Sequence, residues 1–284
     1  MQTRRIGPLT VSAIGLGEMP LSVSGRPSAE QAIETVHAAL DAGVTFIDTA
    51  DAYCLSSDDF GHGEELVAKA LATYGSDTDG VLVATKGGHT RTGDGSWTVD
   101  SSRDYLRSAC EASLKRLGVD AIGLYQHHRP DPEVPYAEAI GTIKELYDAG
   151  KVRHVGISNA TVAQIQQAEA ILGDALVSVQ NQFSPKFRSS EDELAYCASR
   201  GLAFLPWSPL GGIGNASDLG GSLGTFGEVA TARAVSPQQV ALAWALAKAP
   251  VVIPIPGSSR PATIQDSVQA ASLTLTDAEL LSLG

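Results

Sequence analysis

One pattern of alternation runs through the whole chain and constrains its fold more than any other feature. Short apolar or β-branched runs, each typical of a buried strand, alternate with longer stretches of helical periodicity. The eight strand candidates cover residues 13–17, 45–50, 81–86, 121–128, 152–159, 178–184, 203–208 and 251–257. Repetition of strand and helix in this way predicts parallel strands joined by right-handed crossovers.

The ends of the predicted helices carry signals of their own. Ser28 supplies an N-cap for a helix over residues 28–42, and Gly43 follows that helix at the position where glycine favours a stop. Comparable signals predict helices over residues 99–117, 135–149 and 237–248, the first two followed by Gly118 and Gly150 and the last opened by Ser236-Pro237. Each predicted helix therefore ends shortly before the next strand.

Two α/β architectures can accommodate this order of elements. An open, doubly wound sheet needs a Gly-rich turn after an early strand, but the candidate Gly15-Leu16-Gly17 lacks the third glycine and the start of a helix. A closed (β/α)8 TIM barrel needs no such turn, and no linker divides the chain. We therefore expect one barrel domain over residues 1–284, preceded within it by a β-hairpin at residues 1–12 that covers the N-terminal end of the barrel.

Composition limits the cellular locations and the kinds of binding partner that are expected for this chain. The chain is 43% hydrophobic and 18% charged, which suits a large apolar core, and its net charge of -12 disfavours nucleic acid and anionic membranes. No apolar run approaches the roughly 20 residues of a membrane span, and the N-terminus lacks the apolar run of a secretory signal. The three cysteines fit neither a disulfide framework nor a zinc site. These features predict a cytoplasmic protein and do not indicate its oligomeric state.

Polar side chains gather where the predicted strands end, and in a barrel of this kind reactive groups lie at those ends. They are Asp48, Asp51, Tyr53, Lys86, His127, His128, Ser158 and Asn159. A structural ion-pair network would explain an Asp and a Lys by themselves. The phenol favours catalysis instead, because a tyrosine becomes a useful general acid when a cation such as Lys86, itself held by Asp48, eases its ionisation.

Four segments resemble the signatures of the aldo-keto reductases, and the resemblance runs from the first strand to the last helix. The segments are FIDTADAY with the following GHGEELVAKAL, LGVDAIGLYQHHRPDP, IKELYDAGKVRHVGISN and VIPIPGSS. By this resemblance the catalytic tetrad is Asp48, Tyr53, Lys86 and His128. The family's histidine directly precedes an arginine, which selects His128, whereas strand alternation turns His127 to the opposite face, where it packs.

The resemblance implies NADPH-dependent reduction of a small aldehyde or ketone to the alcohol, without a metal. In this mechanism Tyr53 protonates the developing alkoxide and His128 orients the carbonyl oxygen. Lys86 lowers the pKa of Tyr53, and Asp48 fixes the ammonium of Lys86 so that it points at the phenol.

The resemblance also assigns contacts to the cofactor. Ser158, Asn159 and Gln180 would hydrogen-bond the carboxamide, and Trp207 would stack under the nicotinamide ring, unless it simply fills the core. Residues expected along the phosphates are Ser208, Leu210 and Gly211 after one strand, and Gly257, Ser258, Ser259 and Arg260 after the last. The Gly-rich segment 209–227 is either a flexible linker or a strap over the cofactor.

Some positions depart from the family pattern. Thr263 and Ser267 stand where relatives carry a nucleotide-binding arginine and asparagine, which predicts a smaller preference for NADPH over NADH. The loop after Tyr53, CLSSDDFGHG, is longer than usual, and the chain lacks the long C-terminal loops that narrow the pocket in some relatives. We expect an open pocket, and the candidates for its lining, each explained equally well as ordinary surface or core, are Met19, Leu55, His89, Trp97 and Phe183.

Two other functions compete with the reductase. The same fold could serve as a nucleotide-binding regulatory subunit with little turnover, against which the intact tetrad argues. A metal-dependent barrel hydrolase or isomerase could use His62, His89, His127 and His128, but their spacing matches no metal motif.

Overall fold

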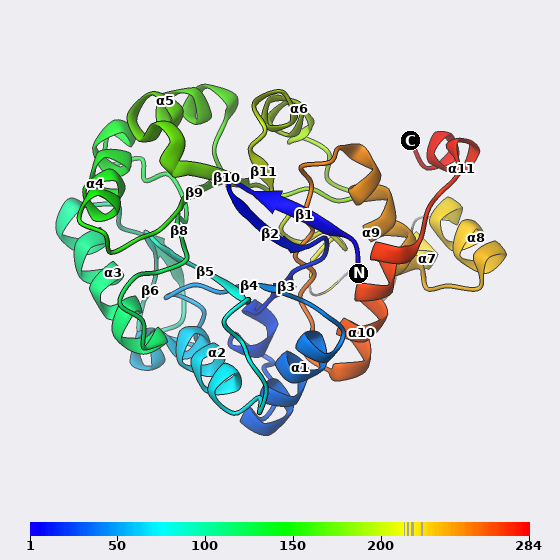
Figure 1. Cartoon of the computed structure of the whole chain (residues 1–284), viewed down its shortest axis with the longest axis horizontal. Coiled ribbons are helices and arrows are strands. Elements are labelled where there is room, and N and C mark those ends of the chain that lie inside the picture. Colours follow the sequence, from blue (N-terminus) through cyan, green and yellow to red (C-terminus); the bar gives the residue numbers. More distant parts are fainter. Residues whose placement is uncertain (213, 215, 217–218, 223) are drawn as a thin grey trace.

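Seven parallel strands form one curved sheet, and helices surround it on the outside (Figure 1). The computed structural model describes residues 1–284 except 213, 215, 217–218 and 223. In spatial order the strands are β11 (Ala203–Phe204), β10 (Leu176–Gln180), β9 (Val155–Ser158), β8 (Leu124–His127), β5 (Leu82–Gly87), β4 (Phe46–Asp48) and β3 (Leu16–Gly17).

The sheet closes through residues 251–257, the predicted eighth strand. Two isolated parallel bridges, Gly17–Gly257 and Phe204–Val252, join this segment to the two edge strands. The segment forms no continuous ladder, because the two prolines of its VIPIP sequence have no N–H to donate. The predicted (β/α)8 barrel is confirmed, with its eighth strand reduced to single bridges.

An antiparallel hairpin of β1 (Thr3–Ile6) and β2 (Leu9–Ser12) crosses the N-terminal end of the barrel (Figure 1). Gly7 makes the turn with a φ of 54°, and a Cβ on it would lie 2.5 Å from Val177, so the turn needs glycine here. Ile6 and Val11 are buried in one cluster with the inward-facing residues of the barrel strands. The predicted hairpin is confirmed, and its apolar face closes this end of the barrel.

The principal helices follow the strands as the pattern predicts. They are α1 (Ala29–Asp41), α2 (His62–Ala72), α3 (Arg103–Leu117), α4 (Tyr136–Asp148), α5 (Val162–Leu172), α6 (Glu191–Arg200), α9 (Pro237–Lys248) and α10 (Pro261–Gln269). Helix α1 begins as predicted, with the Ser28 side chain accepting a hydrogen bond from the Gln31 amide, and Gly43 follows it with a φ of 86°. Helix α3 begins four residues later than predicted, because its expected first residue belongs to a strand.

That strand is part of an antiparallel ribbon, which the sequence analysis did not foresee. β6 (His89–Arg91) pairs with β7 (Trp97–Val99), directly after β5. Two helices, α7 (Leu219–Ser222) and the start of α8 (Gly224–Arg233), lie within the Gly-rich segment 209–227, for which a flexible linker or a strap was expected. Among the described residues, the remaining elements are α11 (Asp277–Leu283) and short 3-10 helices at Met19–Leu21, Ser57–Asp59, Gly173–Ala175 and Ala270–Ser272.

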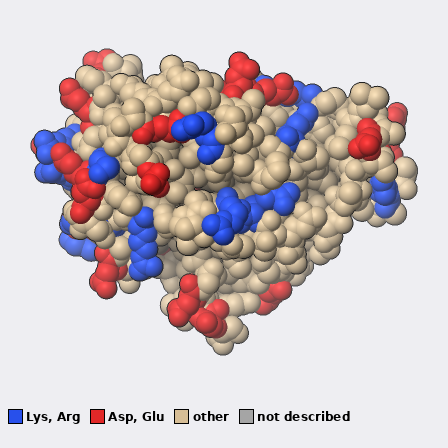
Figure 2. All heavy atoms as spheres, turned by 45° about the horizontal axis from the view of Figure 1, so that its top comes forward, with Lys and Arg blue, Asp and Glu red and all other residues tan. Residues whose placement is uncertain are grey.

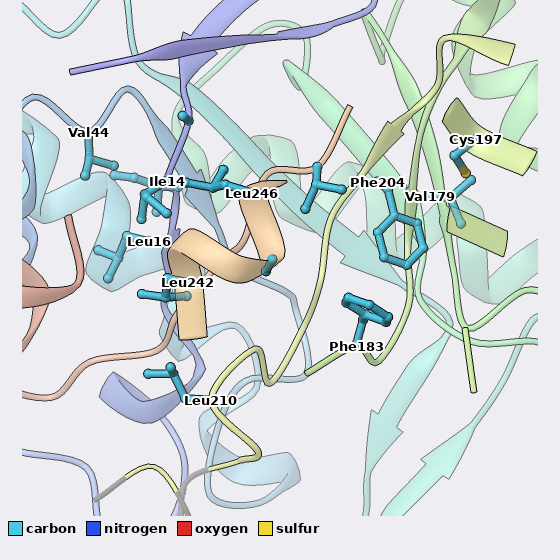
Figure 3. Close-up of a cluster of buried hydrophobic side chains, with 14 of the residues drawn as sticks. Ile14, Leu16, Val44, Val179, Phe183, Cys197, Phe204, Leu210, Leu242 and Leu246 are labelled. Atoms are coloured by element: carbon cyan, nitrogen blue, oxygen red, sulfur yellow. The ribbon is translucent and has the colours of Figure 1, made fainter. Parts of the chain in front are cut away.

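Of the two alternatives for Phe183, the lining of the pocket is wrong and packing in the core is confirmed. Its side chain is fully buried, stacks on Trp244 with ring centroids 5.4 Å apart, and meets the edge of Phe204 at 6.0 Å. Figure 3 shows Phe183 and Phe204 facing each other within the apolar cluster. Aromatic packing of this kind belongs to the core between the barrel and its helices.

Charged groups are spread over the face of the molecule that is seen in Figure 2. Figure 2 shows basic and acidic side chains in small groups separated by uncharged surface. Within the described part of the chain, no helix is both long enough and apolar enough to cross a membrane.

Candidate active site

A cavity of about 660 Å³ opens at the carboxyl ends of the barrel strands. Such a volume lies within the range of small-molecule sites. Its wall combines strand ends, the loop after β11 and the β6–β7 ribbon. The predicted site residues among its lining are Asp48, Tyr53, His128, Ser158, Asn159, Gln180, Trp207, Ser208, Leu210 and Gly257, together with the predicted pocket residues Met19, His89 and Trp97.

Lys86 lies fully buried beneath this cavity and joins three groups. Its Nζ is 2.6 Å from Asp48 Oδ2, 2.9 Å from the carbonyl oxygen of Thr49 and 3.0 Å from Tyr53 Oη. An ammonium has three N–H donors, so all of them are used. The residues predicted from β4, its following loop and β5 therefore meet at one point, and the ammonium is aimed at the phenol.

Two glutamines hold the second carboxylate oxygen of Asp48. The Nε2 groups of Gln126 and Gln180 each donate to Asp48 Oδ1 at 2.8 Å. Gln126 was not foreseen, although strand alternation offered a signal, because it lies two residues before His128 and faces the same side of β8. The carboxylate is thereby fixed on both oxygens and cannot rotate away from Lys86.

Burial and charge set the protonation states of Lys86 and Tyr53. Burial lowers the pKa of Lys86, but Asp48 and Tyr53 outweigh it, and the net pKa is raised. Burial raises the pKa of Tyr53 above 10, and Lys86 opposes this shift, as expected, without cancelling it. At neutral pH the pair is therefore an ammonium beside a protonated phenol.

The two adjacent histidines point in different directions. His128 lines the cavity, and its ring meets the edge of Tyr53 with centroids 5.7 Å apart. Burial, followed by the charge of Lys86, holds the pKa of His128 well below 6.5, so the imidazole is neutral. His127 lies outside the barrel, where its Nε2 is 2.8 Å from Ser101 Oγ and its ring packs on Tyr136. No cluster of three or more potential metal ligands occurs among the described residues.

Polar atoms at the predicted nicotinamide contacts are mostly used within the protein. Asn159 Nδ2 donates to the His128 carbonyl oxygen at 3.0 Å and to Ser158 Oγ at 2.9 Å, while Ser158 Oγ donates to the Gln180 carbonyl oxygen at 2.8 Å. Both amide hydrogens of Gln180 are engaged, with Asp48 and Gln126. The capacity left on these three side chains is for accepting, which matches the two N–H donors of a carboxamide.

Trp207 is half-buried in the cavity wall beside these residues. Its Nε1 donates to Asn159 Oδ1 at 3.2 Å, which holds the ring in one orientation. The ring also packs on the apolar cluster inside the barrel. Trp207 thus presents part of its surface to the cavity, as a stacking platform requires, while it also fills space.

The predicted phosphate contacts divide into two groups. Ser208 and Leu210 line the cavity with Gly212, and the Gly211 amide donates to the Ser208 carbonyl oxygen at 2.9 Å. On the other side Gly257 lines the cavity, whereas Ser258, Ser259 and Arg260 lie just beyond its lining, at the start of α10. Of the Gly-rich segment, residues 213, 215, 217–218 and 223 lie outside the described residues.

The other two candidates lie away from the cavity lining. Leu55 is exposed. Asp51 is buried, accepts a hydrogen bond from Tyr105 at 3.3 Å, and has a pKa raised well above 3.8 by burial and by Glu64.

Glu18 is a buried acid that the sequence analysis missed. Its Oε2 accepts from Thr49 Oγ1 at 2.9 Å, Ser22 Oγ donates to its Oε1, and the same Ser22 Oγ lies 2.7 Å from His62 Nδ1. Burial raises the pKa of Glu18 to about 7, against the lowering effect of Ser22, Thr49 and Lys86. No sequence motif marks Glu18, because only the folded chain brings it beside Thr49 and Lys86.

Comparison with known proteins identifies the family. The family model described as the aldo/keto reductase family matches residues 13–283. The chain belongs to this family. An uncharacterized oxidoreductase from Schizosaccharomyces pombe is 36% identical, with 96% of this chain and 86% of that protein covered. A 6-dehydroglucose reductase from Novosphingobium aromaticivorans is 37% identical, with 92% of this chain and 87% of that protein covered.

Solved structures give the same family. An aldo/keto reductase from Klebsiella pneumoniae, solved with NADP and acetate, superposes with a TM-score of 0.81 at 27% identity, covering 99% of this chain and 93% of that one. The predicted family and the predicted NAD(P)H-dependent oxidoreductase are confirmed, and NADP(H) is the cofactor of the family.

Proposed function

We propose that this aldo/keto reductase uses NADPH to reduce an aldehyde or ketone to the alcohol, with Tyr53 as the proton donor. The observation that carries the proposal is the 3.0 Å contact between Tyr53 Oη and the buried Nζ of Lys86, at the floor of an open cavity. A phenol in this position is protonated when a carbonyl compound binds, and the ammonium of Lys86 lies beside it to stabilise the phenolate that forms when the proton is transferred.

The chain supplies the acid chemistry through this pair. As negative charge develops on the substrate oxygen, Tyr53 transfers its proton there, and the ammonium of Lys86 stabilises the phenolate that remains. Asp48 holds the ammonium at 2.6 Å and is itself held by Gln126 and Gln180, so no reorganisation is needed during the step. Neutral His128, on the same cavity wall, can donate one N–H to the carbonyl oxygen and orient it.

NADPH, when bound, supplies the hydride. Ser158, Asn159 and Gln180 would accept from its carboxamide, and Trp207 would support the ring. Ser208, Leu210 and Gly211 would lie along the pyrophosphate, and Gly257 to Arg260 would meet the adenosine phosphate at the start of α10. The NADP complex of the Klebsiella pneumoniae relative supports this choice of cofactor.

Three wider expectations accompany this proposal. We expect residues 1–284 to act as one domain, in the cytoplasm, with small molecules as ligands. The net charge of -12 supports the exclusion of nucleic acid, and the distribution of strands and helices over the chain supports the single domain.

Replacement of Tyr53 by phenylalanine tests the proposal. The variant should lose at least about 100-fold in NADPH-dependent reduction of benzaldehyde, because the proton donor is gone. Its affinity for NADPH, followed by fluorescence titration, should stay near that of wild type. The control is Tyr74→Phe, which removes an exposed hydroxyl bonded to Asp41.

Activity of Tyr53→Phe above about a tenth of wild type would show that another group donates the proton. Tight NADPH binding by wild type without reduction of any aldehyde or ketone would instead favour the regulatory subunit.

A further inference from the structure

The side of the cavity formed by the β6–β7 ribbon and the residue after His128 carries an unused cation. Of the described lining residues, two carry a formal charge, Asp48 and Arg129. Asp48 is neutralised by Lys86. Arg129 has neither an ion pair nor a hydrogen bond to any described side chain or backbone group, and its Nε is buried without a partner.

Neighbouring acids do not compensate Arg129. Asp131, two residues further along, uses its Oδ2 to accept the Ser101 amide and its Oδ1 to accept the Glu133 amide, each at 2.9 Å. Arg129 influences His89 and His128. Burial is the main cause that lowers the pKa values of these two histidines, and the positive charge of Arg129 lowers them further. A half-buried guanidinium without an ion-pair partner is costly unless an anion meets it.

The wall beside Arg129 is aromatic, and contacts between its rings hold it in place. His89 stacks on Trp97 with ring centroids 4.5 Å apart, and its ring edge meets His128 at 4.8 Å. The guanidinium of Arg91 lies over the Trp97 ring, with its Cζ 3.4 Å from the ring centroid. Arg91 Nη2 also donates to the Cys54 carbonyl oxygen at 2.9 Å, which connects the ribbon to the loop after β4. Trp97 remains 40% exposed, so it offers a surface for the carbon framework of a substrate.

We propose that Arg129 binds an anionic group of the substrate, so that the carbonyl compound reduced here carries a carboxylate or a phosphate. This inference rests on the proposed function, which places the carbonyl oxygen at Tyr53 and His128. Arg129 follows His128 directly and its charge acts on His89 of the ribbon, so the anion would lie on the ribbon side of the cavity. The guanidinium has the planar fork that binds carboxylate and phosphate through two hydrogen bonds. In a protein of net charge -12, a local cation is needed to attract such a substrate.

Matched pairs of aldehydes test the inference and separate the two anions. One pair is 4-carboxybenzaldehyde and its neutral methyl ester, and the other is pyridoxal 5′-phosphate and pyridoxal. For at least one pair, wild type should show a kcat/KM that is roughly 10- to 100-fold higher for the anion. The pair that shows the preference identifies carboxylate or phosphate as the recognised group.

Variants at Arg129 decide whether this side chain is responsible. Arg129→Gln should bring the ratio of kcat/KM within the preferred pair close to 1, and Arg129→Lys should restore part of it. Because the readout is a ratio, a general effect on turnover cancels. The control is Arg103→Gln on α3, whose exposed guanidinium pairs with Glu145 outside the cavity, and it should leave the ratio at the wild-type value.

Binding of benzoate and of inorganic phosphate, measured by calorimetry, gives a readout that does not depend on turnover. At least one of these anions should bind Arg129→Gln roughly tenfold more weakly than wild type. Ratios near 1 in wild type for both pairs, or ratios and anion affinities that Arg129→Gln does not change, would overturn the inference while Tyr53-dependent reduction stands. Failure of wild type to reduce any aldehyde would overturn the proposed function, and the anion affinities would still judge Arg129.

Discussion

The two sides of the cavity differ in how completely their polar groups are paired. Around Lys86, every donor of the ammonium and both oxygens of Asp48 have partners within 3.0 Å. On the ribbon side, Arg129 has no described partner and Trp97 is 40% exposed. Saturated contacts suit groups that must hold one geometry through a reaction, whereas unpaired groups suit the binding of something from outside.

The two sides also differ in the kind of backbone that carries them. We call the side around Lys86 and Asp48 the paired side, and the side with Arg129 and Trp97 the open side. The paired side is built from the ends of β4, β5, β8 and β10, where neighbouring strands fix each Cα. The open side is built from a short ribbon and from residues after strand ends. The positioning of the Lys86 ammonium by barrel strands and the recognition of substrate by the connections can vary independently, as is usual for this architecture.

The largest effect should come from breaking the paired side at its centre. We expect Lys86→Met to lose at least about 100-fold in aldehyde reduction, because Tyr53 loses its cation and Asp48 is left as an unpaired buried charge. Steady-state turnover together with thermal unfolding separates chemistry from stability. Lys144→Met, which removes a half-buried lysine paired with Asp148 on the outside of α4, is the control. A folded Lys86→Met protein with wild-type turnover would contradict the proposed role of all four residues.

The buried acid of the paired side should make stability depend on pH. The pKa of Glu18 is raised from 4.5 to about 7, so its contribution to stability is fully present below pH 4.5 and is lost as pH rises through 7. The loss is roughly 3 kcal/mol in the free energy of unfolding. Urea unfolding at several pH values should show that Glu18→Gln flattens this dependence relative to wild type.

Exposed Glu65→Gln on α2 is the control for Glu18, and it should keep the wild-type dependence on pH. An identical slope in wild type and Glu18→Gln would mean that Glu18 titrates in the folded protein much as it does in the unfolded chain.

A smaller effect, on the preference for NADPH over NADH, is expected at the start of α10, where Arg260 would meet the cofactor's 2′-phosphate. NADPH should bind more tightly than NADH, and Arg260→Ala should reduce that preference by roughly 10-fold, because a charged hydrogen bond is lost. Dissociation constants for both cofactors, measured by fluorescence, check this. Arg153→Ala, an exposed change at the opposite end of the barrel, should not alter the ratio. Equal affinities in wild type, or an unchanged ratio in Arg260→Ala, would show that the start of α10 does not read the phosphate.

Local sequence determined the order of strands and helices and the positions of the candidate catalytic residues along the chain. Strand and helix alternation predicted the barrel, and caps such as Ser28 marked helix starts, because both depend on neighbours a few residues apart. The strand pattern also placed Asp48, Lys86 and His128 at strand ends and Tyr53 in the loop after one of them, and the family resemblance grouped these four residues, which the structure brings together. Their roles stay predictions until the variants are measured.

Tertiary structure decided what depends on contacts between distant residues. Gln126 and Gln180 reach Asp48 across 78 and 132 residues of chain, and only barrel closure brings them together. The β6–β7 ribbon is too short to show a period, and the burial of Phe183 depends on Trp244. The net pKa of Tyr53 depends on its burial and on the charges of Lys86 and Asp48 beside it, which only the folded chain provides. Whether Arg129 has an ion-pair partner also depends on the fold, because an acid far away in the sequence could have been placed next to it.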